Sequence, residues 1–148
     1  MIRTIFFTFL IAAPSITAAD EIATKDAVRR AIPDRLVVLT FDDSAKSHYT
    51  VVRPILKQYG FGATFFITEG FDFKSNKKDF MTWEPIKELH EDGFEIGNHT
   101  RDHLGITEKT LDQLAEQIDG IAQQCTAHDI PVPVTFAWPG NAITPAAL

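Results

Sequence analysis

The feature that most constrains the fold is a repeated alternation, from Leu36 onward, of short apolar runs with amphipathic helical patterns. The run at 36–41 is apolar on both alternating faces, which is typical of a strand buried in a parallel sheet. The runs expected to form strands lie at 36–41, 62–67, 94–98 and 134–138. The patterns expected to form helices lie at 50–59, 82–92 and 110–125. This βαβαβαβ order predicts a parallel sheet with right-handed crossovers.

The strand number limits which α/β fold the chain can complete. Four strands are few for a closed barrel. Residues 139–148 carry no pattern for another helix and strand, so we expect the chain to end before the fold is finished. The predicted fold class is therefore α/β, as an incomplete (β/α) barrel with parallel strands and covering helices. An open sheet edge and an uncovered apolar face predict marginal stability.

The first residues of the chain have a different character from the rest. Arg3 is followed by the apolar run Ile5–Ala13, and the small residues Thr17–Ala19 come next. This pattern predicts a secretory signal peptide that is cleaved after Ala19, because the apolar run is too short for the alternative, a membrane anchor. We therefore expect a secreted or periplasmic protein with no membrane span in the mature chain. The expected organisation is a signal peptide at 1–19, a leader at 20–34 and the folded domain at 35–148.

Charge and cysteine content exclude several classes of partner and structure. The formal net charge of −6 argues against nucleic acid or an anionic membrane surface as the main partner. No pattern identifies a protein partner. Cys125 is the only cysteine, so an internal disulfide is impossible. It lies on the apolar face of the helix expected at 110–125, which predicts a buried and inert thiol.

Polar side chains gather where the predicted strands end. Asp42 and Asp43 directly follow the first strand, and His99 and His103 follow the third. The carboxyl ends of parallel strands lie along one edge of the sheet, where α/β folds build their active sites. We therefore expect these side chains to lie together at that edge, along with Trp138-Pro139 at the end of the fourth strand.

This combination of residue types suits a metal-dependent hydrolase. One carboxylate and two imidazoles form a ligand set for a divalent metal such as zinc and leave positions open for water and substrate. Such a metal polarises an amide or ester carbonyl and supplies a water nucleophile, and the second carboxylate is free to accept a proton. Alone, an Asp-Asp pair is more often a turn or cap, and an H-x-x-x-H pair is more often a surface feature. Their joint placement after alternate strands favours the site.

The same segments carry a resemblance to a known family. They are Thr40-Phe41-Asp42-Asp43, Gly62–Ile67, Phe94–Asn98 and His99-Thr100-Arg101-Asp102-His103. In types and spacing they resemble the NodB-homology domain of polysaccharide deacetylases, carbohydrate esterase family four. The resemblance implies that Asp42 is the general base, that Asp43, His99 and His103 bind the metal, and that Thr100 supports the second motif by hydrogen bonding. It implies zinc as the expected metal, with other transition metals open, and an N-acetylated polysaccharide as the substrate that loses acetyl groups.

Three departures from the family pattern affect what the chain is expected to do. Ser44 stands where the family often has glycine. Ala137 replaces the arginine of the third motif, beside Trp138 and Pro139, which are expected to support the site or line a substrate groove. The later motifs, including the histidine that acts as general acid, have no counterpart in this chain. We therefore expect a domain truncated after the third motif, with little activity of its own.

Other functions stay open on the residues alone. The preferred interpretation is a hydrolase of non-peptide carbon–nitrogen bonds. One alternative is a non-catalytic remnant of the same fold that binds a metal or a glycan, and another is a hydrolase of a small non-peptide amide. His48, shortly after the Asp pair, is predicted to be a solvated loop histidine.

Overall fold

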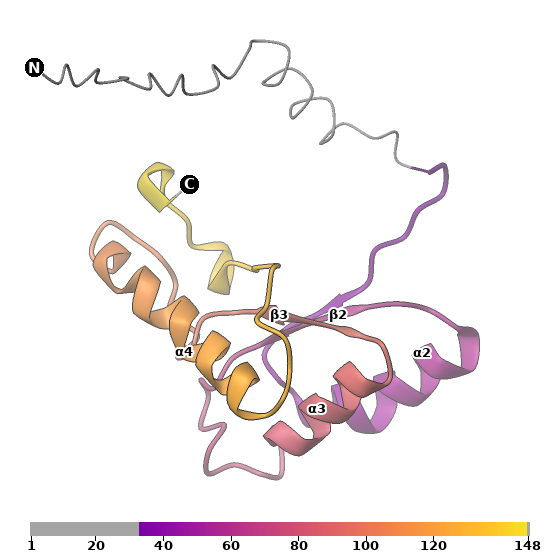
Figure 1. Ribbon diagram of the computed structural model, residues 1–148. Coiled ribbons are helices and arrows are strands. Elements are labelled where there is room, and N and C mark those ends of the chain that lie inside the picture. Colours follow the sequence, from indigo (N-terminus) through magenta and orange to yellow (C-terminus); the bar gives the residue numbers. More distant parts are fainter. Residues whose placement is uncertain (1–32, 148) are drawn as a thin grey trace, which may run out of the picture. The chain divides into compact units, whose positions relative to one another are not determined.

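The computed structural model describes residues 33–147, and the chain divides into two units, Met1–Leu36 and Val37–Leu148. The second unit is built on a parallel sheet with the strand order β1-β2-β3 (Figure 1). The strands are β1 (Thr40–Phe41), β2 (Thr64–Ile67) and β3 (Glu95–Asn98). All pairing is parallel, with Thr40 opposite Thr64 and Thr64 opposite Glu95. The chain therefore brings the carboxyl ends of all three strands to one edge.

The two outermost predicted strands are shorter than expected. Pairing of β1 covers only Thr40–Phe41, and the predicted strand at 134–138 is reduced to one parallel bridge between Asn98 and Phe136. Val37 and Val38 are 75% and 72% exposed, and Val134 is 92% exposed. The apolar runs were correctly located, but burial on both faces was wrong at these positions. No described segment covers these side chains, so the local pattern alone does not produce a ladder there.

The helices lie close to their predicted positions. They are α2 (Arg53–Tyr59), α3 (Trp83–Glu91) and α4 (Leu114–Ala127). Single turns extend two of them at the N-terminal side, η1 (His48–Val52) before α2 and η2 (Leu111–Gln113) before α4. The short turns η3 (Pro139–Asn141) and η4 (Pro145–Ala147) follow near the end of the chain.

The Thr110 side chain does not cap the helix, although threonine at 110 and glutamine at 113 have the spacing of a capping box. The Thr110 hydroxyl donates to the Gly105 carbonyl at 2.9 Å, and α4 begins only at Leu114, after the η2 turn. The Thr110 hydroxyl also accepts a hydrogen bond from the Thr107 amide. The side chain therefore stabilises the preceding loop and makes no cap bond to the helix.

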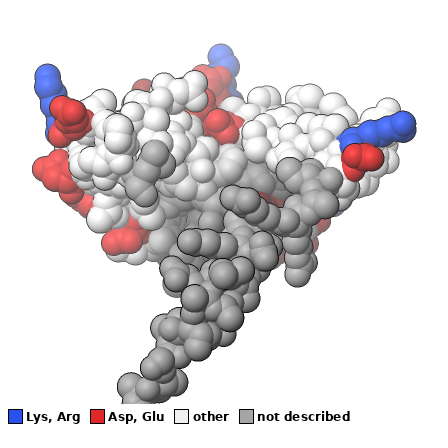
Figure 2. All heavy atoms as spheres, turned by 90° about the horizontal axis from the view of Figure 1, so that it is seen from above, with Lys and Arg blue, Asp and Glu red and all other residues white. Residues whose placement is uncertain are grey.

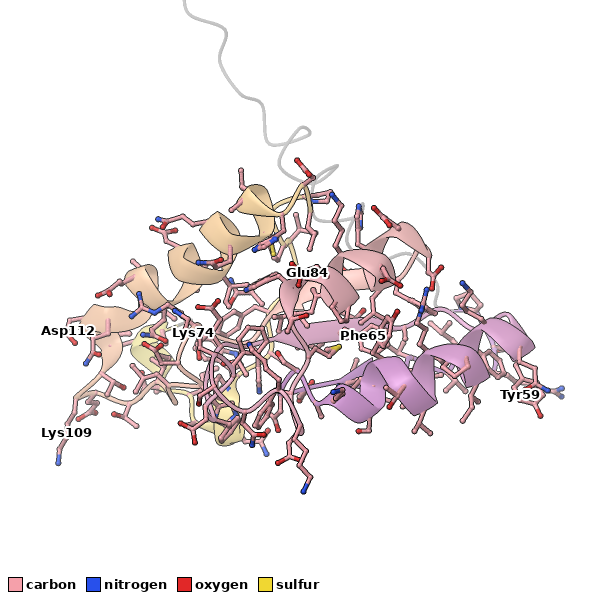
Figure 3. All side chains as sticks on the ribbon, turned by 90° about the horizontal axis from the view of Figure 1, so that it is seen from below. Tyr59, Phe65, Lys74, Glu84, Lys109 and Asp112 are labelled. Atoms are coloured by element: carbon pink, nitrogen blue, oxygen red, sulfur yellow. The ribbon has the colours of Figure 1, made fainter. Side chains whose placement is uncertain are left out.

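The core lies between the sheet and the helices that cover one of its faces. Phe65 of β2 lies inside this layer between α2 and α3, whereas Tyr59 projects from the end of α2 (Figure 3). Cys125 is fully buried as predicted, and burial raises the pKa of its thiol to about 11. The buried cluster consists of Leu56, Phe65, Ile67, Phe73, Met81, Trp83, Ile86, Leu89, Phe94, Ile96, Ile121, Cys125 and Ile130.

Polar contacts hold α2 against α3. Arg53 pairs with Asp92 and, at 3.4 Å, with Glu88, and Lys57 also pairs with Asp92. Tyr49, which lies in η1, donates its hydroxyl proton to Glu88 of α3. Seen from above, most of the described surface is uncharged, and neither sign of charge forms a continuous patch on that side (Figure 2).

Two expectations concern parts of the chain that the structure does not describe. The predicted signal peptide at 1–19 and nearly all of the leader at 20–34 lie outside residues 33–147. Within 33–147, none of the helices combines the length and the apolar character that crossing a bilayer requires.

Candidate metal centre

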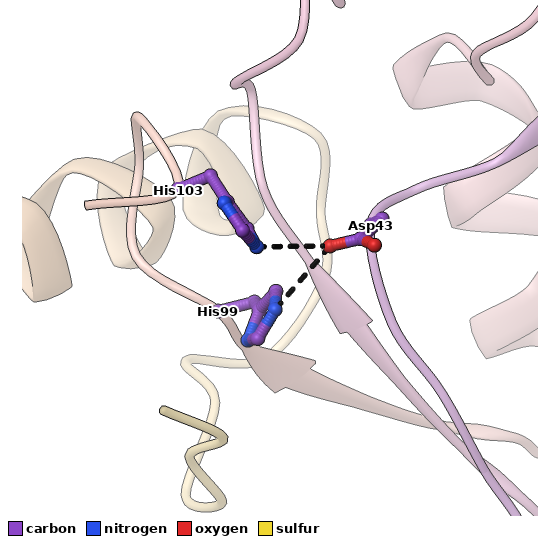
Figure 4. A group of neighbouring side chains, drawn as sticks. All are labelled: Asp43, His99 and His103. Atoms are coloured by element: carbon purple, nitrogen blue, oxygen red, sulfur yellow. Dashed lines mark ion pairs between the residues drawn. The ribbon is translucent and has the colours of Figure 1, made fainter. Parts of the chain in front are cut away.

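Three of the predicted site residues meet at the carboxyl edge of the sheet. Asp43 follows β1, and His99 and His103 lie on the loop after β3 (Figure 4). The Oδ1 atom of Asp43 lies 3.4 Å from Nε2 of His99 and 3.2 Å from Nε2 of His103. One ligand atom from each residue falls within 4.8 Å of the others, which is compact enough for a single cation.

The backbone at this edge adopts an uncommon conformation. Asp43 and Ser44 have φ values of 72° and 56°, and Thr100 and His103 have values of 59° and 54°. Residues other than glycine rarely occupy this left-handed region, and such residues cluster at functional sites. The local sequence therefore tolerates strain at the positions that aim the three side chains toward one another.

The Ser44 hydroxyl holds the end of β1 against the end of β2. It donates to the Thr68 carbonyl at 2.7 Å and accepts from the Thr68 amide at 2.9 Å. Ser44 is buried, so both backbone groups of Thr68 are satisfied in a place that water does not reach. The serine that departs from the family pattern thus has a structural role next to Asp43.

The orientation of His99 is set by the main chain. Its Nδ1 lies 2.9 Å from the carbonyl oxygen of Ala137, and the ring is 3% exposed. A carbonyl only accepts, so Nδ1 carries the proton and donates it. The lone pair of Nε2 is then left facing Asp43, which is the tautomer and direction that a metal ligand needs.

The electrostatics of the group also suit a cation. Burial lowers the pKa of His103 below its ordinary value, the nearby Asp43 opposes that shift, and His99 adds to it. His103 is therefore held in the neutral form that binds metals. Asp43 Oδ1 is buried and has no hydrogen-bond partner among residues 33–147. An ionised oxygen without a partner is costly unless a cation neutralises it, so the residues fit a divalent metal.

Asp42, the predicted base, lies beside this group without joining it. Its side chain is exposed, and it forms no ion pair with any described residue. Its negative charge acts on His48 and His103. The position therefore leaves a carboxylate open to solvent next to the three converging side chains.

The remaining predicted residues are not among the three converging side chains. Thr100 is fully buried, and its hydroxyl makes a long bond of 3.5 Å to the Leu104 carbonyl. Trp138 is half-buried and packs against Phe136 with ring centroids 4.7 Å apart. Pro139, the first residue of η3, is buried, so of its two expected roles the burial favours support of the site, and its role stays a prediction.

His48 also differs from its prediction. Instead of lying in a solvated loop it begins η1, and its ring packs near Phe41 and Phe65 at centroid distances of 5.5 and 6.1 Å. Burial lowers its pKa, against the opposing charges of Asp43 and Asp42. His48 is the first residue of the η1 turn, and its imidazole lies beside the aromatic rings of the core.

Residues that the sequence did not single out hold the loop of the two histidines. Asn98 donates to the Ile118 carbonyl at 2.9 Å and accepts from the Thr100 amide at 3.0 Å. A Cβ at Gly70 would lie 2.8 Å from the Cβ of His103, so only glycine permits this approach. Of the residues that hold this loop, Gln117 is the one that the sequence could have revealed, because it is a polar residue at a core position of α4.

Sequence similarity relates the chain to known proteins. A family model described as polysaccharide deacetylase matches residues 29–148. The chain is 30% identical over 115 residues to the peptidoglycan-N-acetylglucosamine deacetylase of Bacillus cereus, a match that covers 76% of this chain and 50% of that protein. It is 33% identical over 92 residues to the peptidoglycan-N-acetylmuramic acid deacetylase PdaA of Bacillus subtilis, covering 62% of this chain and 32% of that protein.

A solved structure extends the likeness to the fold. The structure of the Streptococcus pyogenes deacetylase PplD in complex with acetate matches with a TM-score of 0.71 and 21% identity, over 88% of this chain and 57% of that chain. This agreement confirms the predicted α/β class and the incomplete barrel. The chain spans about a third to a half of the length of the two curated relatives. Because the family model matches most of its length, the chain belongs to the polysaccharide deacetylase family.

Proposed function

We propose that this chain forms the metal-binding part of a hydrolase that removes N-acetyl groups from the amino sugars of a polysaccharide. The observation that carries the proposal is the convergence of Asp43, His99 and His103 within 4.8 Å at the strand edge. The curated relatives are named for deacetylation of peptidoglycan, which makes an N-acetylated cell-wall polymer the first substrate to test.

The proposed ligands are Asp43, His99 and His103, and the proposed metal is zinc. Two neutral imidazoles and one carboxylate form a ligand set that zinc accepts, with a position left for water and the acetyl carbonyl. A divalent cation bound there polarises the amide carbonyl and makes a water nucleophile available near neutral pH. The main-chain bond from His99 to Ala137 supports the assignment, since it fixes the ligand tautomer in advance.

The proposed base is Asp42. Its exposed carboxylate has no ion pair among the described residues, so it is free to accept a proton from the attacking water. Asp43 cannot serve in this role while it binds the cation, because its Oδ1 faces both imidazoles. In this proposal Asp43 binds the metal, and Asp42 accepts the proton.

Several further assignments belong to the same proposal. The folded domain is placed at 35–148, behind a signal peptide at 1–19 that directs the protein to the periplasm or the exterior. Trp138, half-buried after the fourth apolar run, is the candidate for a contact with substrate. Departure of the sugar amine needs a proton donor, and no described residue is assigned to this step. Little deacetylase activity is therefore expected from this chain by itself.

The experiment that tests the proposal measures metal binding and acetate release separately. The full chain is titrated with Zn²⁺ by calorimetry, alongside Asp43→Ala, His103→Ala and the exposed helix variant Asp119→Ala as control. We expect one tight site in the wild type and the control, and no tight site in the other two. Unchanged zinc affinity in either ligand variant would refute the assignment.

Acetate release then separates the enzyme from a remnant. Chitin oligosaccharides and peptidoglycan fragments are incubated with the zinc-loaded chain, and free acetate is measured. Slow release that disappears in Asp42→Asn supports the hydrolase. Tight zinc binding with no release from either substrate would instead favour the non-catalytic alternative.

A further inference from the structure

Gln117 of α4 contacts the loop that carries the two histidines through three hydrogen bonds. Its side-chain amide donates to Oδ2 of Asp102 at 2.8 Å, and its Oε1 accepts from the Asp102 amide at 2.9 Å. Its own carbonyl accepts from the Arg101 amide at 3.0 Å. Gln117 is 3% exposed, so these bonds form away from competing water.

The same turn of α4 also receives the side chain of Arg101. A Cβ at Gly120 would lie 2.8 Å from Cδ and 3.0 Å from Cβ of Arg101, so the arginine stem lies directly on the helix there. The guanidinium pairs with Asp102 at 2.8 Å and with Glu116 at 3.2 Å. Because a Cβ would meet the arginine stem, glycine suits this helix position, although inside a helix it costs about 1 kcal/mol relative to alanine.

The opposite side of the loop is held by the end of β2. The Arg101 carbonyl accepts from the Glu69 amide at 2.7 Å and from the Thr68 hydroxyl at 3.1 Å. The segment between the two histidines is thus fixed between β2 and α4. Thr100 and His103 both have left-handed backbones, so the loop depends on such outside contacts to keep its shape.

We infer that Gln117 is a positioning residue, which fixes Asp102 and through it the adjacent ligand His103 in the geometry that faces Asp43. The inference rests on the proposed metal site. Gln117 forms none of its hydrogen bonds with Asp43, His99 or His103 and lies on a different element. It acts by setting the path of the backbone that carries His103. Loss of its bonds frees the loop, and the three ligand atoms then no longer start close together.

The test compares variants of the full chain by their affinity for Zn²⁺ and by their Co²⁺ absorption spectrum, which reports coordination geometry. Gln117→Met keeps the length of the side chain and removes its two side-chain hydrogen bonds with Asp102. We expect about tenfold weaker zinc binding and an altered Co²⁺ spectrum, as for other residues that orient metal ligands from outside. Gln123→Met makes the same change on the exposed side of α4, and Ile121→Val mildly destabilises the core beneath it. Both controls should bind zinc like the wild type.

A second pair of variants separates positioning from through-space charge. Gln117→Glu places a carboxylate against Asp102, so the 2.8 Å bond becomes a repulsion. An added negative charge near the cation would by itself strengthen binding, whereas displacement of the loop weakens it. We expect Gln117→Glu to bind zinc more weakly than the wild type, and Asp102→Asn in the same chain to restore most of the affinity by restoring a donor–acceptor pair.

The outcomes distinguish this inference from the function on which it rests. A wild-type chain that binds no metal would refute the site itself, and the inference with it. Wild-type binding with an unchanged affinity in Gln117→Met would overturn the inference alone. If circular dichroism shows that Gln117→Met does not fold, the zinc affinity of Gln117→Glu, with and without Asp102→Asn, tests the inference instead. Zinc binding by Gln117→Glu that equals or exceeds that of the wild type would then overturn the role of Gln117.

Discussion

Replacing Ser44 by alanine tests how the strand ends beside Asp43 are held together. The Ser44 hydroxyl is the partner of both backbone groups of Thr68, as donor at 2.7 Å and as acceptor at 2.9 Å. Alanine removes both bonds and leaves a buried amide and a buried carbonyl without partners. Ser44→Gly removes the same bonds but also relieves the left-handed backbone, whose φ is 56°.

The expected magnitudes follow from these contacts. A buried polar group without a partner costs about 1–3 kcal/mol, so two such groups predict a loss of about 2–4 kcal/mol for Ser44→Ala when partial relaxation is allowed. A side chain in the left-handed region costs about 1–2 kcal/mol, which glycine avoids, although glycine gains entropy in the unfolded chain. We therefore expect Ser44→Gly to lose about 1 kcal/mol less than Ser44→Ala.

Urea unfolding of the metal-free chain, followed by circular dichroism, measures these differences. Ser47→Ala is the control, since Ser47 is exposed and its side chain makes no cap bond. Its free energy of unfolding should stay within about 0.5 kcal/mol of the wild type. If the free energy of unfolding of Ser44→Ala equals that of this control, the reasoning is refuted. It is also refuted if Ser44→Gly is less stable than Ser44→Ala.

Three further predictions concern pH, the α4 surface and the buried thiol. Burial lowers the pKa of His48 and His103 below 6.5, so just below that pH the unfolded chain binds more protons than the folded chain. The free energy of unfolding of the metal-free chain should therefore decrease between pH 7.5 and pH 5.5 in urea titrations, and a constant or rising value contradicts this. Gly120→Ala should not yield the usual gain of about 1 kcal/mol in chemical denaturation, because the new Cβ meets Arg101; a full gain would show that the arginine moves freely. Cys125 should stay unreactive toward a thiol reagent at pH 8 until the chain unfolds, given its burial and a pKa of about 11; rapid labelling of the folded chain would disprove its burial.

Local periodicity predicted the parts of this fold that depend on neighbouring residues. The apolar runs and helical patterns located α3, α4 and the ends of β1 and β3. Because active sites of parallel sheets form at the carboxyl ends of the strands, Asp43, His99 and His103 were expected at one edge. The catalytic and ligand roles of these residues stay predictions until they are tested. Their geometric proximity was accessible because it depends only on strand direction and spacing.

The features that escaped prediction depend on contacts between distant segments. Whether 134–138 becomes a strand depends on what covers it, and the pattern of Val134 and its neighbours does not contain that information. The loop role of Thr110 arises because Gly105 offers a carbonyl that competes with the helix amides. Gln117 falls on the apolar face of its helix, but which polar groups it meets there depends on the path of the loop after β3.

The bond between His99 and the carbonyl of Ala137 has a consequence for how freely this part of the chain can change during evolution. A carbonyl group belongs to every amino acid, so exchanging the side chain at 137 does not remove the acceptor that orients the ring. The residue at position 137 can therefore be substituted while the His99 imidazole keeps its orientation. Only a change in the course of the main chain, such as an insertion or deletion before Trp138, would misdirect it.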